Sequence, residues 1–154
     1  MIEIREARFP QDRHDVERLF RAYAASLSID LCFQGFEEEV AQLPGAYAPP
    51  GGVLLVAQAG GAVLGCGAMR RHDAETAEMK RVYLVPAGRG QGAGLALVEA
   101  ILAAARKACY RRMVLDTLPE LAEAQALYRR LGFREIAPYY HNPAPGVVYL
   151  GLEL

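Results

Sequence analysis

The two residue types that most often carry metal or redox chemistry are scarce in this chain. It holds three cysteines and three histidines in 154 residues. Cys32, Cys66 and Cys109 have no Cys-x-x-Cys spacing, which favours free thiols in a reducing compartment over disulfides or a redox site. The histidines lie far apart and form no His-x-His or His-x-x-x-His pair. We therefore expect no metal site.

An excess of charge and a long apolar run are also missing. The formal net charge is −1 and the isoelectric point is about 6.3, which predicts no nucleic-acid or acidic-membrane partner. No apolar run approaches the ~20 residues that cross a bilayer. The first residues, Met1 to Glu6, are charged and contain no signal-peptide core. These features predict a cytoplasmic protein without membrane or nucleic-acid partners.

What the chain does contain predicts one folded α/β domain over residues 1–154. Hydrophobic residues make up 53% of it, and it has no repeat, low-complexity segment or linker. Period-2 and period-3.6 patterns predict the order β-α-α-β-β-β-α-β-α-β-β, a mixed sheet with helices on both faces. Asp12 is the expected N-cap of the first helix and Gly132 the expected end of the last. The expected strands cover residues 2–4, 53–58, 62–69, 78–85, 113–116 and 148–154, with another beginning at Phe133. The expected helices cover residues 12–27, 36–43, 95–105 and 119–131.

The segment from Glu78 to Leu97 is the most informative part of the sequence. An apolar run, Val82 to Val85, ends at Pro86, and a glycine-rich turn then opens into a helical pattern. A strand–turn–helix of this kind points backbone N–H groups and the positive end of a helix dipole at a phosphate. Glycine allows close approach of the ligand and positive φ angles. The segment therefore predicts a phosphate-bearing ligand at residues 89–95.

Two nucleotide-binding motifs are poorer matches to this turn. A phosphate-loop NTPase needs Lys-Ser/Thr after its last glycine, and this chain has Leu95-Ala96 after Gly94. A Rossmann fingerprint fits the spacing Gly88-x-Gly90-x-x-Ala93. However, Pro86-Ala87 separates the glycines from the strand, a strand meander precedes the turn, and too little chain follows for a second mononucleotide half. An NAD(P)-dependent Rossmann enzyme therefore stays a third hypothesis.

A different spacing in the same turn, Arg89-x-x-Gly92-x-Gly94, resembles the acyl-CoA pyrophosphate loop of the GNAT (GCN5-related) N-acetyltransferase superfamily. Two further segments support the resemblance. Residues 83–86, Tyr-Leu-Val-Pro, resemble the end of the family's fourth strand, and residues 124–133 resemble its Ala-x-x-Leu-Tyr-x-x-x-Gly-Phe signature. The resemblance implies a single-domain, mostly antiparallel sheet with splayed fourth and fifth strands and helices on both faces. It also implies an acetyl-CoA-dependent N-acetyltransferase that needs no metal.

The resemblance assigns cofactor contacts to two stretches of main chain. The pantetheine arm is expected to add beside the fourth strand, with one strand N–H facing the developing oxyanion. Leu121 stands where many family members carry an asparagine that bonds the cofactor, so that side-chain contact is in doubt. The implied diphosphate-binding residues are Arg89, Gly90, Gln91, Gly92, Ala93, Gly94 and Leu95, and the implied pantetheine-binding residues are Tyr83, Leu84 and Val85.

Two side chains are candidates for proton transfer. Glu78 falls where one branch of the family places its general base, and a base is needed because an amine with a pKa near 10 is protonated at neutral pH. Alternatively, Glu78 is a strand-edge carboxylate that pairs with Lys80 or is solvated. Tyr128 matches the family's general acid, which protonates the departing thiolate. Alternatively, it is a core tyrosine on the apolar stripe of its helix.

The acceptor is the least determined part of the sequence reading. Tyr139, Tyr140 and Asn142 lie between the last two strands, where the family often walls its acceptor pocket, and residues 30–36 are expected to form the other wall. These groups suit a small amine or amino acid, although Tyr139 or Tyr140 packing against the core explains them equally. We expect a primary amine of a small molecule or peptide as acceptor, and a homodimer is compatible with the resemblance. The rival hypothesis is a non-catalytic acyl-CoA-binding or sensing module of the same fold.

Overall fold

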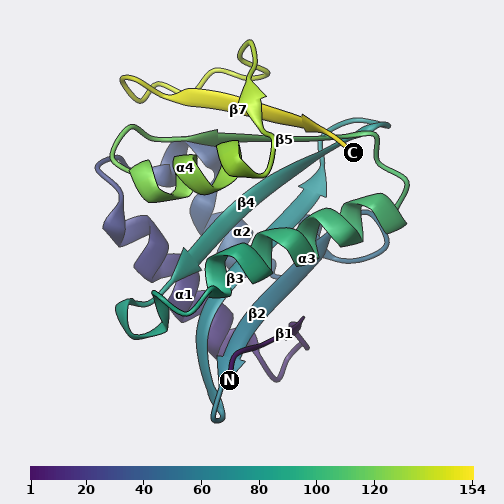
Figure 1. Ribbon diagram of the computed structural model, residues 1–154. Helices are drawn as coiled ribbons and strands as arrows, with labels where there is room; N and C mark the ends of the chain where they lie inside the picture. Colours follow the sequence, from purple (N-terminus) through teal and green to yellow (C-terminus); the bar gives the residue numbers. More distant parts are fainter.

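Seven strands form one sheet in the order β1-β2-β3-β4-β5-β7-β6 (Figure 1). All neighbouring strands are antiparallel except β4 and β5, which are parallel. The computed structural model describes all 154 residues. The strands are β1 (Glu3–Glu6), β2 (Val53–Ala59), β3 (Ala62–Arg71), β4 (Thr76–Leu84), β5 (Arg112–Thr117), β6 (Arg134–Glu135) and β7 (Val148–Glu153).

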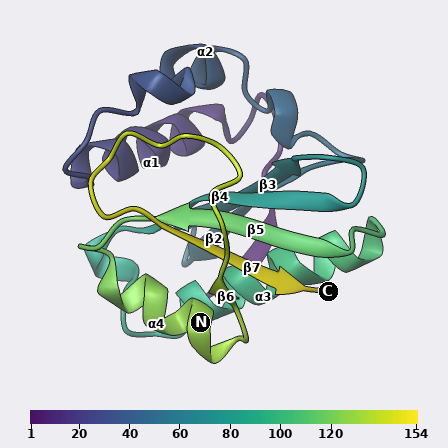
Figure 2. The same ribbon diagram turned by 90° about the horizontal axis from the view of Figure 1, so that it is seen from above.

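Helices cover both faces of this sheet. Figure 2 shows α1 and α2 on one face and α3 and α4 on the other. The α-helices are α1 (Arg13–Ser26), α2 (Phe36–Ala41), α3 (Ala93–Lys107) and α4 (Ala122–Arg130), and the 3₁₀ turns are η1 (Leu31–Gln34), η2 (Gly45–Tyr47) and η3 (Pro86–Gly88). The order of elements and the placement of helices confirm the expected fold. No helix has both the length and the apolar character to span a membrane.

Each face of the sheet has its own apolar core. Under α3 and α4 the largest buried side chains include Leu97, Ile101 and Met113. Under α1 and α2 they include Leu19 and Phe20, both with no exposed surface. The sheet is therefore fixed from both sides, and burial of this apolar area is the main driving force for holding its strands in place.

Local expectations for turns and caps have different outcomes. Gly60 and Gly61 have φ of +55° and +84° in the β2–β3 hairpin, and Gly132 has φ +101° just after α4, as a turn and a helix end require. Asp12 does precede α1, but its side chain makes no cap hydrogen bond. It binds the Arg5 guanidinium at 2.7 Å and holds β1 against the start of α1 instead. This ion pair keeps the pKa of Asp12 at about 2.

Several boundaries differ from the predicted ranges, and two of these differences have a clear structural reason. The last helix begins at Ala122 rather than Pro119, because Leu121 has φ −92° and ψ 55°, outside the helical region. The strand expected from Phe133 contains only Arg134–Glu135. It lies at the edge of the sheet and pairs with β7 alone, so nothing extends its pairing on the other side.

The parallel pairing of β4 with β5 is short. It joins Thr76, Ala77 and Glu78 to Arg112, Met113 and Val114. Both strands continue beyond this point without pairing to each other, as the expected splay requires. We call the region beyond this last pair the β4–β5 opening.

One extra residue sits in β4 opposite β3. The register shifts between Cys66 and Ala68, and Arg81 has φ +62° at the same place, which together describe a β-bulge. The bulge reverses which side chains of β4 face α3 and α4. Before it these are the odd-numbered Ala77 and Met79, and after it they are the even-numbered Val82 and Leu84. After the bulge, Tyr83 and Val85 pack on the opposite face.

Candidate active site

The glycine turn between β4 and α3 leaves a row of backbone amides without acceptors. Gly90 and Gly92 have φ of +78° and +79°, which glycine adopts without strain. The amide of Ala96 donates to the carbonyl of Gly92 at 3.0 Å, whereas the amides of residues 90–95 donate to no group in the protein. With the positive end of the α3 dipole behind them, these amides form a binding site for an anion.

The space in front of this turn is open. A Cβ atom added at Gly90 or Gly92 would meet no atom within 4 Å. At Gly94 it would lie 3.6 Å from Leu84 and 3.9 Å from Leu127, so this glycine faces the protein. A ligand can therefore approach the amides from the side of Gly90 and Gly92.

The two long side chains of the turn fold back onto the chain behind it. Arg89 donates from Nε to the carbonyl of Leu84 at 3.0 Å, and its guanidinium lies 5.7 Å from the ring centroid of Tyr83. Gln91 donates to the carbonyl of Ala87 at 3.3 Å. Both head groups are therefore held by main-chain carbonyls that precede the row of free amides.

The end of β4 offers fewer main-chain groups than the resemblance implies. Val85 donates its N–H to β3 at 2.9 Å, and its carbonyl accepts the amide of Gly88 at 2.9 Å. Because hydrogen bonding alternates along an antiparallel strand, Tyr83 also faces β3, whereas Leu84 faces the β4–β5 opening. Of these three residues, Leu84 has its main-chain N–H free for a ligand, while its carbonyl accepts Arg89. The roles of Tyr83, Leu84 and Val85 in pantetheine binding stay predictions.

Glu78 is a buried carboxylate rather than a solvated one, with 3% of its side chain exposed. Its Oε1 accepts Arg70 Nε at 3.0 Å, and its Oε2 accepts the Tyr139 hydroxyl at 2.7 Å. Lys80 Nζ lies 4.0 Å from Oε2, so the pairing considered from the sequence is the weaker contact. Burial and the neighbouring carboxylate raise the pKa of Tyr139, which keeps its proton in place.

A chain of hydrogen-bonded side chains connects β4 to β5 across the β4–β5 opening. Lys80 Nζ donates to Gln34 Oε1 at 3.0 Å, Gln34 Nε2 donates to the Tyr140 hydroxyl at 2.9 Å, and that hydroxyl donates to Asp116 Oδ2. We call these four side chains the polar bridge. Asn142 Nδ2 also donates to Asp116 Oδ2, at 2.8 Å. Burial lowers the pKa of Lys80 to about 8, and the nearby Glu78 opposes that change.

Tyr128 lies at the inner side of α4 with its ring in the core. The ring centroid is 5.6 Å from that of Phe133, and 7% of the residue is exposed. Burial raises its pKa, so the hydroxyl stays protonated, and no acceptor in the protein holds that proton. The packing agrees with a core tyrosine, and the free hydroxyl is compatible with the acid role, which stays a prediction.

Arg70, Gln34 and Asp116 were not predicted from the sequence as members of this site. Arg70 stands directly opposite Glu78 in the β3–β4 hairpin, so counting back from the turn between these strands would have found it. Gln34 comes from η1 and reaches Tyr140, 106 residues away. No local sequence pattern predicts the contact between Gln34 and Tyr140. The structure thus places Tyr139 on Glu78, and Tyr140 and Asn142 on Asp116. Their role as an acceptor wall stays a prediction.

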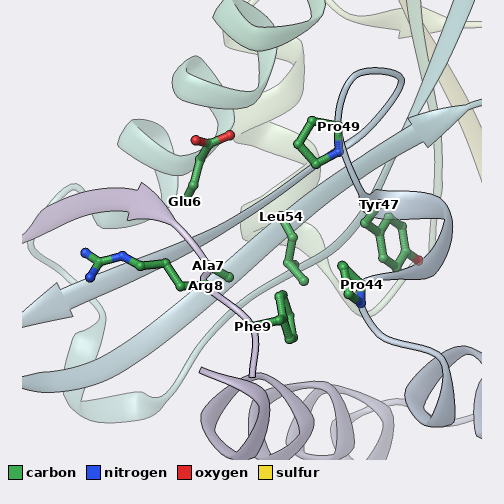
Figure 3. A pocket seen from close by; sticks show the side chains of 8 residues that line it. All are labelled: Glu6, Ala7, Arg8, Phe9, Pro44, Tyr47, Pro49 and Leu54. Carbon is green, nitrogen blue, oxygen red and sulfur yellow. The ribbon is translucent and has the colours of Figure 1, made fainter. Parts of the chain in front are cut away.

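Two cavities lie away from the glycine turn. One, of about 660 Å³, is lined by β6, β7 and the segment between them, including Tyr139, Tyr140 and Asn142. The other, of about 510 Å³, lies beside η2 (Figure 3). There Phe9, Pro44 and Leu54 come together, and the charged ends of Glu6 and Arg8 point away from them. None of the predicted site residues lines this second cavity. No cluster of three or more histidine, cysteine or acidic side chains is arranged to hold a metal.

Comparisons with known proteins agree with this geometry. The model of the Acetyltransferase (GNAT) family matches residues 13–133. An uncharacterized N-acetyltransferase of Schizosaccharomyces pombe is 41% identical over 155 residues, covering 99% of this chain and 95% of the yeast protein.

Two solved structures share the fold. A GNAT-family acetyltransferase from Staphylococcus aureus Mu50 superposes with a TM-score of 0.83 at 18% identity, covering 99% of each chain. A protein from Salmonella typhimurium, solved with its cofactor acetyl-CoA, superposes with a TM-score of 0.73 at 20% identity and covers 99% of this chain and 94% of that one. At these identities the two structures show the fold alone.

Proposed function

This chain belongs to the acetyltransferase (GNAT) family, and from that premise we propose that it acetylates a primary amine of a small molecule or peptide with acetyl-CoA as donor. The observation that carries the proposal is the row of amides at residues 90–95, which lack acceptors at the start of α3. Such a row suits the diphosphate of a coenzyme A species. The related fold from Salmonella typhimurium was solved with acetyl-CoA, which supports the same donor here.

Donor binding divides between the turn and β4. The amides of residues 90–95 would hold the diphosphate, and the N–H of Leu84 would donate to the pantetheine arm, since the Leu84 carbonyl already accepts Arg89 Nε. This N–H faces the β4–β5 opening, where it is a fixed donor for the oxygen of the thioester as negative charge develops. Arg89 and Gln91 keep clear of the diphosphate through their bonds to the main chain.

Glu78 takes the proton of the acceptor amine in this proposal. An amine with a pKa near 10 is protonated at neutral pH and cannot attack until that proton leaves. Because Glu78 is 3% exposed and Tyr139 covers its Oε2 at 2.7 Å, the proton passes through the Tyr139 hydroxyl. The tyrosine oxygen receives one proton from the amine while its own proton moves to Glu78.

Transfer then occurs by direct attack. The amine nitrogen forms a bond to the thioester carbonyl carbon, the carbon–sulfur bond breaks, and the leaving sulfur takes the proton of the Tyr128 hydroxyl. The nitrogen loses its second proton as it becomes an amide, and that proton restores the hydroxyl of Tyr128. An acyl-cysteine intermediate has no support. Burial raises the pKa of the Cys66 thiol to about 12, and Cys66 Sγ lies 3.2 Å from the carbonyl of Arg81, so no thiolate is available there.

Two measurements test this function. Calorimetry with acetyl-CoA, CoA and NAD should show saturable binding of the CoA species alone. A thiol-release assay over a library of amines should then show turnover with at least one primary amine. Binding of acetyl-CoA without turnover of any amine would favour the non-catalytic module, and absence of CoA binding would contradict the proposal altogether. The homodimer and the cytoplasmic location stay predictions.

A further inference from the structure

Two opposite charges face each other across the β4–β5 opening without touching. The last parallel pair joins Glu78 to Val114. Two residues further along each strand, on the same face of the sheet, stand Lys80 and Asp116. If the strands stayed paired these side chains would be neighbours, but Lys80 forms its ion contact with Glu78, at 4.0 Å, and none with Asp116. The divergence of the strands therefore keeps a cation and an anion apart.

Neutral groups fill the space between these charges. Gln34 places an amide oxygen on Lys80 at 3.0 Å, and Tyr140 places a hydroxyl proton on Asp116 Oδ2. The polar bridge is closed by the bond from Gln34 to Tyr140 at 2.9 Å. The ammonium of Lys80 thus meets the neutral amide oxygen of Gln34 rather than a carboxylate, and the carboxylate of Asp116 meets the neutral hydroxyl of Tyr140 rather than an ammonium. Charge-assisted hydrogen bonds are stronger than these neutral ones.

The charges on the β4 side do not balance. Glu78 is held by Arg70 at 3.0 Å, so Lys80 shares this carboxylate at the longer distance of 4.0 Å. The Lys80 side chain is 4% exposed, and a buried cation whose counter-ion is shared and 4.0 Å away is poorly compensated. On the other strand Asp116 accepts both Tyr140 and Asn142 on Oδ2, and Oδ1 has no donor. The charges of Lys80 and Asp116 are therefore met at hydrogen-bond distance by neutral groups alone.

We propose that the acceptor belongs to the amino-acid class, with its carboxylate bound by Lys80 in place of Gln34 and its ammonium bound by Asp116 in place of the Tyr140 hydroxyl. This inference rests on the proposed function and names its acceptor. Both displaced groups come from outside the sheet, Gln34 from η1 and Tyr140 from the segment between β6 and β7. They can therefore leave the two charges without any change in β4 or β5. Asn142 stays on Asp116 Oδ2 and keeps that carboxylate in position.

Matched acceptors test the proposal. Each of several L-amino acids is compared with its amide and with the amine left by removing the carboxyl group, using thiol release from acetyl-CoA. We expect kcat/KM for the amino acid to exceed that for either analogue by about 10-fold or more, since one charge-assisted contact is lost in the analogues. In Lys80→Met this ratio should fall to near 1, and in Asp116→Asn the KM for every amine should rise.

The chain offers a matched control for the lysine variant. Lys107 is the only other lysine and lies exposed at the end of α3, so Lys107→Met should leave the ratio unchanged. As a second variant, Lys80→Arg retains the charge and must keep a ratio well above 1. The wild-type ratio tests the proposal without any variant.

Failure of the inference differs from failure of the proposed function. If the amide and the carboxyl-free amine are acetylated as well as the amino acid, or if Lys80→Met keeps the wild-type ratio, the amino-acid acceptor is wrong and the transferase stands. If no amine releases thiol, both proposals are wrong.

Discussion

Replacing Gly92 with valine tests the placement of the diphosphate most directly. Gly92 has φ +79°, a conformation that a non-glycine residue adopts at a cost of roughly 1–2 kcal/mol. A Cβ there meets no protein atom within 4 Å, so the free protein has no clash to relieve. The valine side chain instead stands in front of the amides of residues 90–95, in the space that the proposed ligand needs.

The expected magnitudes follow from these two effects. The φ strain should lower the free energy of unfolding by ~1–2 kcal/mol, or the Tm by about 3–8 °C for a domain of this size. Loss of one charge-assisted hydrogen bond costs roughly 1.5–3 kcal/mol, so CoA should bind about 30-fold more weakly, which corresponds to ~2 kcal/mol. Calorimetry with CoA gives the affinity, and thermal melts without ligand give the stability.

Gly61→Val is a closely matched control. Gly61 has φ +84° in the β2–β3 turn, and a Cβ added there also meets nothing within 4 Å. It should lose a similar amount of stability and keep the wild-type affinity for CoA. If Gly92→Val binds CoA within about 3-fold of the wild-type protein, the reasoning that places the diphosphate at this turn is refuted.

The remaining predictions concern the buried ionisable groups. Tyr128→Phe should lower kcat about 10–100-fold at unchanged KM for acetyl-CoA and unchanged Tm, because the hydroxyl bonds nothing in the protein; an unaltered kcat removes it from the mechanism. Glu78→Gln should lower kcat by about 100-fold or more and the free energy of unfolding by roughly 1–3 kcal/mol, since Arg70 loses its partner; steady-state kinetics and urea denaturation measure the two effects. Burial lowers the pKa of Lys80 to about 8, below its unfolded value, so the folded state loses this proton first. The buried charge of Lys80 therefore lowers the free energy of unfolding by its full amount below pH 8, and this loss of stability disappears as the pH rises toward 10.5. Lys80→Met should be more stable than wild type at pH 7, and the difference between their free energies of unfolding should narrow by up to ~3 kcal/mol by pH 10, as measured by urea denaturation at both pH values. A difference that does not change with pH contradicts the lowered pKa of Lys80.

The sequence predicts the fold well where the signal is local. The glycine turn, the β2–β3 hairpin and the apolar stripes of α1 and α3 each depend on residues within a few positions of one another, and the order of elements follows from them. Asp12 shows the limit of such reasoning. Its position before α1 predicts a cap, but Arg5, brought alongside by the β1–β2 pairing, offers two charge-assisted bonds instead.

Individual residues of the candidate site could be predicted from the sequence, but the hydrogen bonds between them could not. Glu78, Tyr139 and Tyr140 were identified from a family resemblance and from their place between strands. Their partners depend on tertiary packing, as with Gln34, which reaches Tyr140 from a 3₁₀ turn near the start of the chain. The hydrogen bond from the N–H of Val85 to β3 likewise depends on the strand register, which a sequence pattern alone does not determine.

The bulge at Arg81 changes how positions in β4 should be compared between proteins. Side chains normally share a face when their numbers are both odd or both even, yet here Glu78 and Lys80 share one with Tyr83. Shortening the strand by one residue at this point would exchange the surroundings of Tyr83 and Leu84 while leaving Glu78 where it is. An alignment without a gap to a relative that lacks the bulge would therefore match a residue of the α3–α4 face with one of the opposite face.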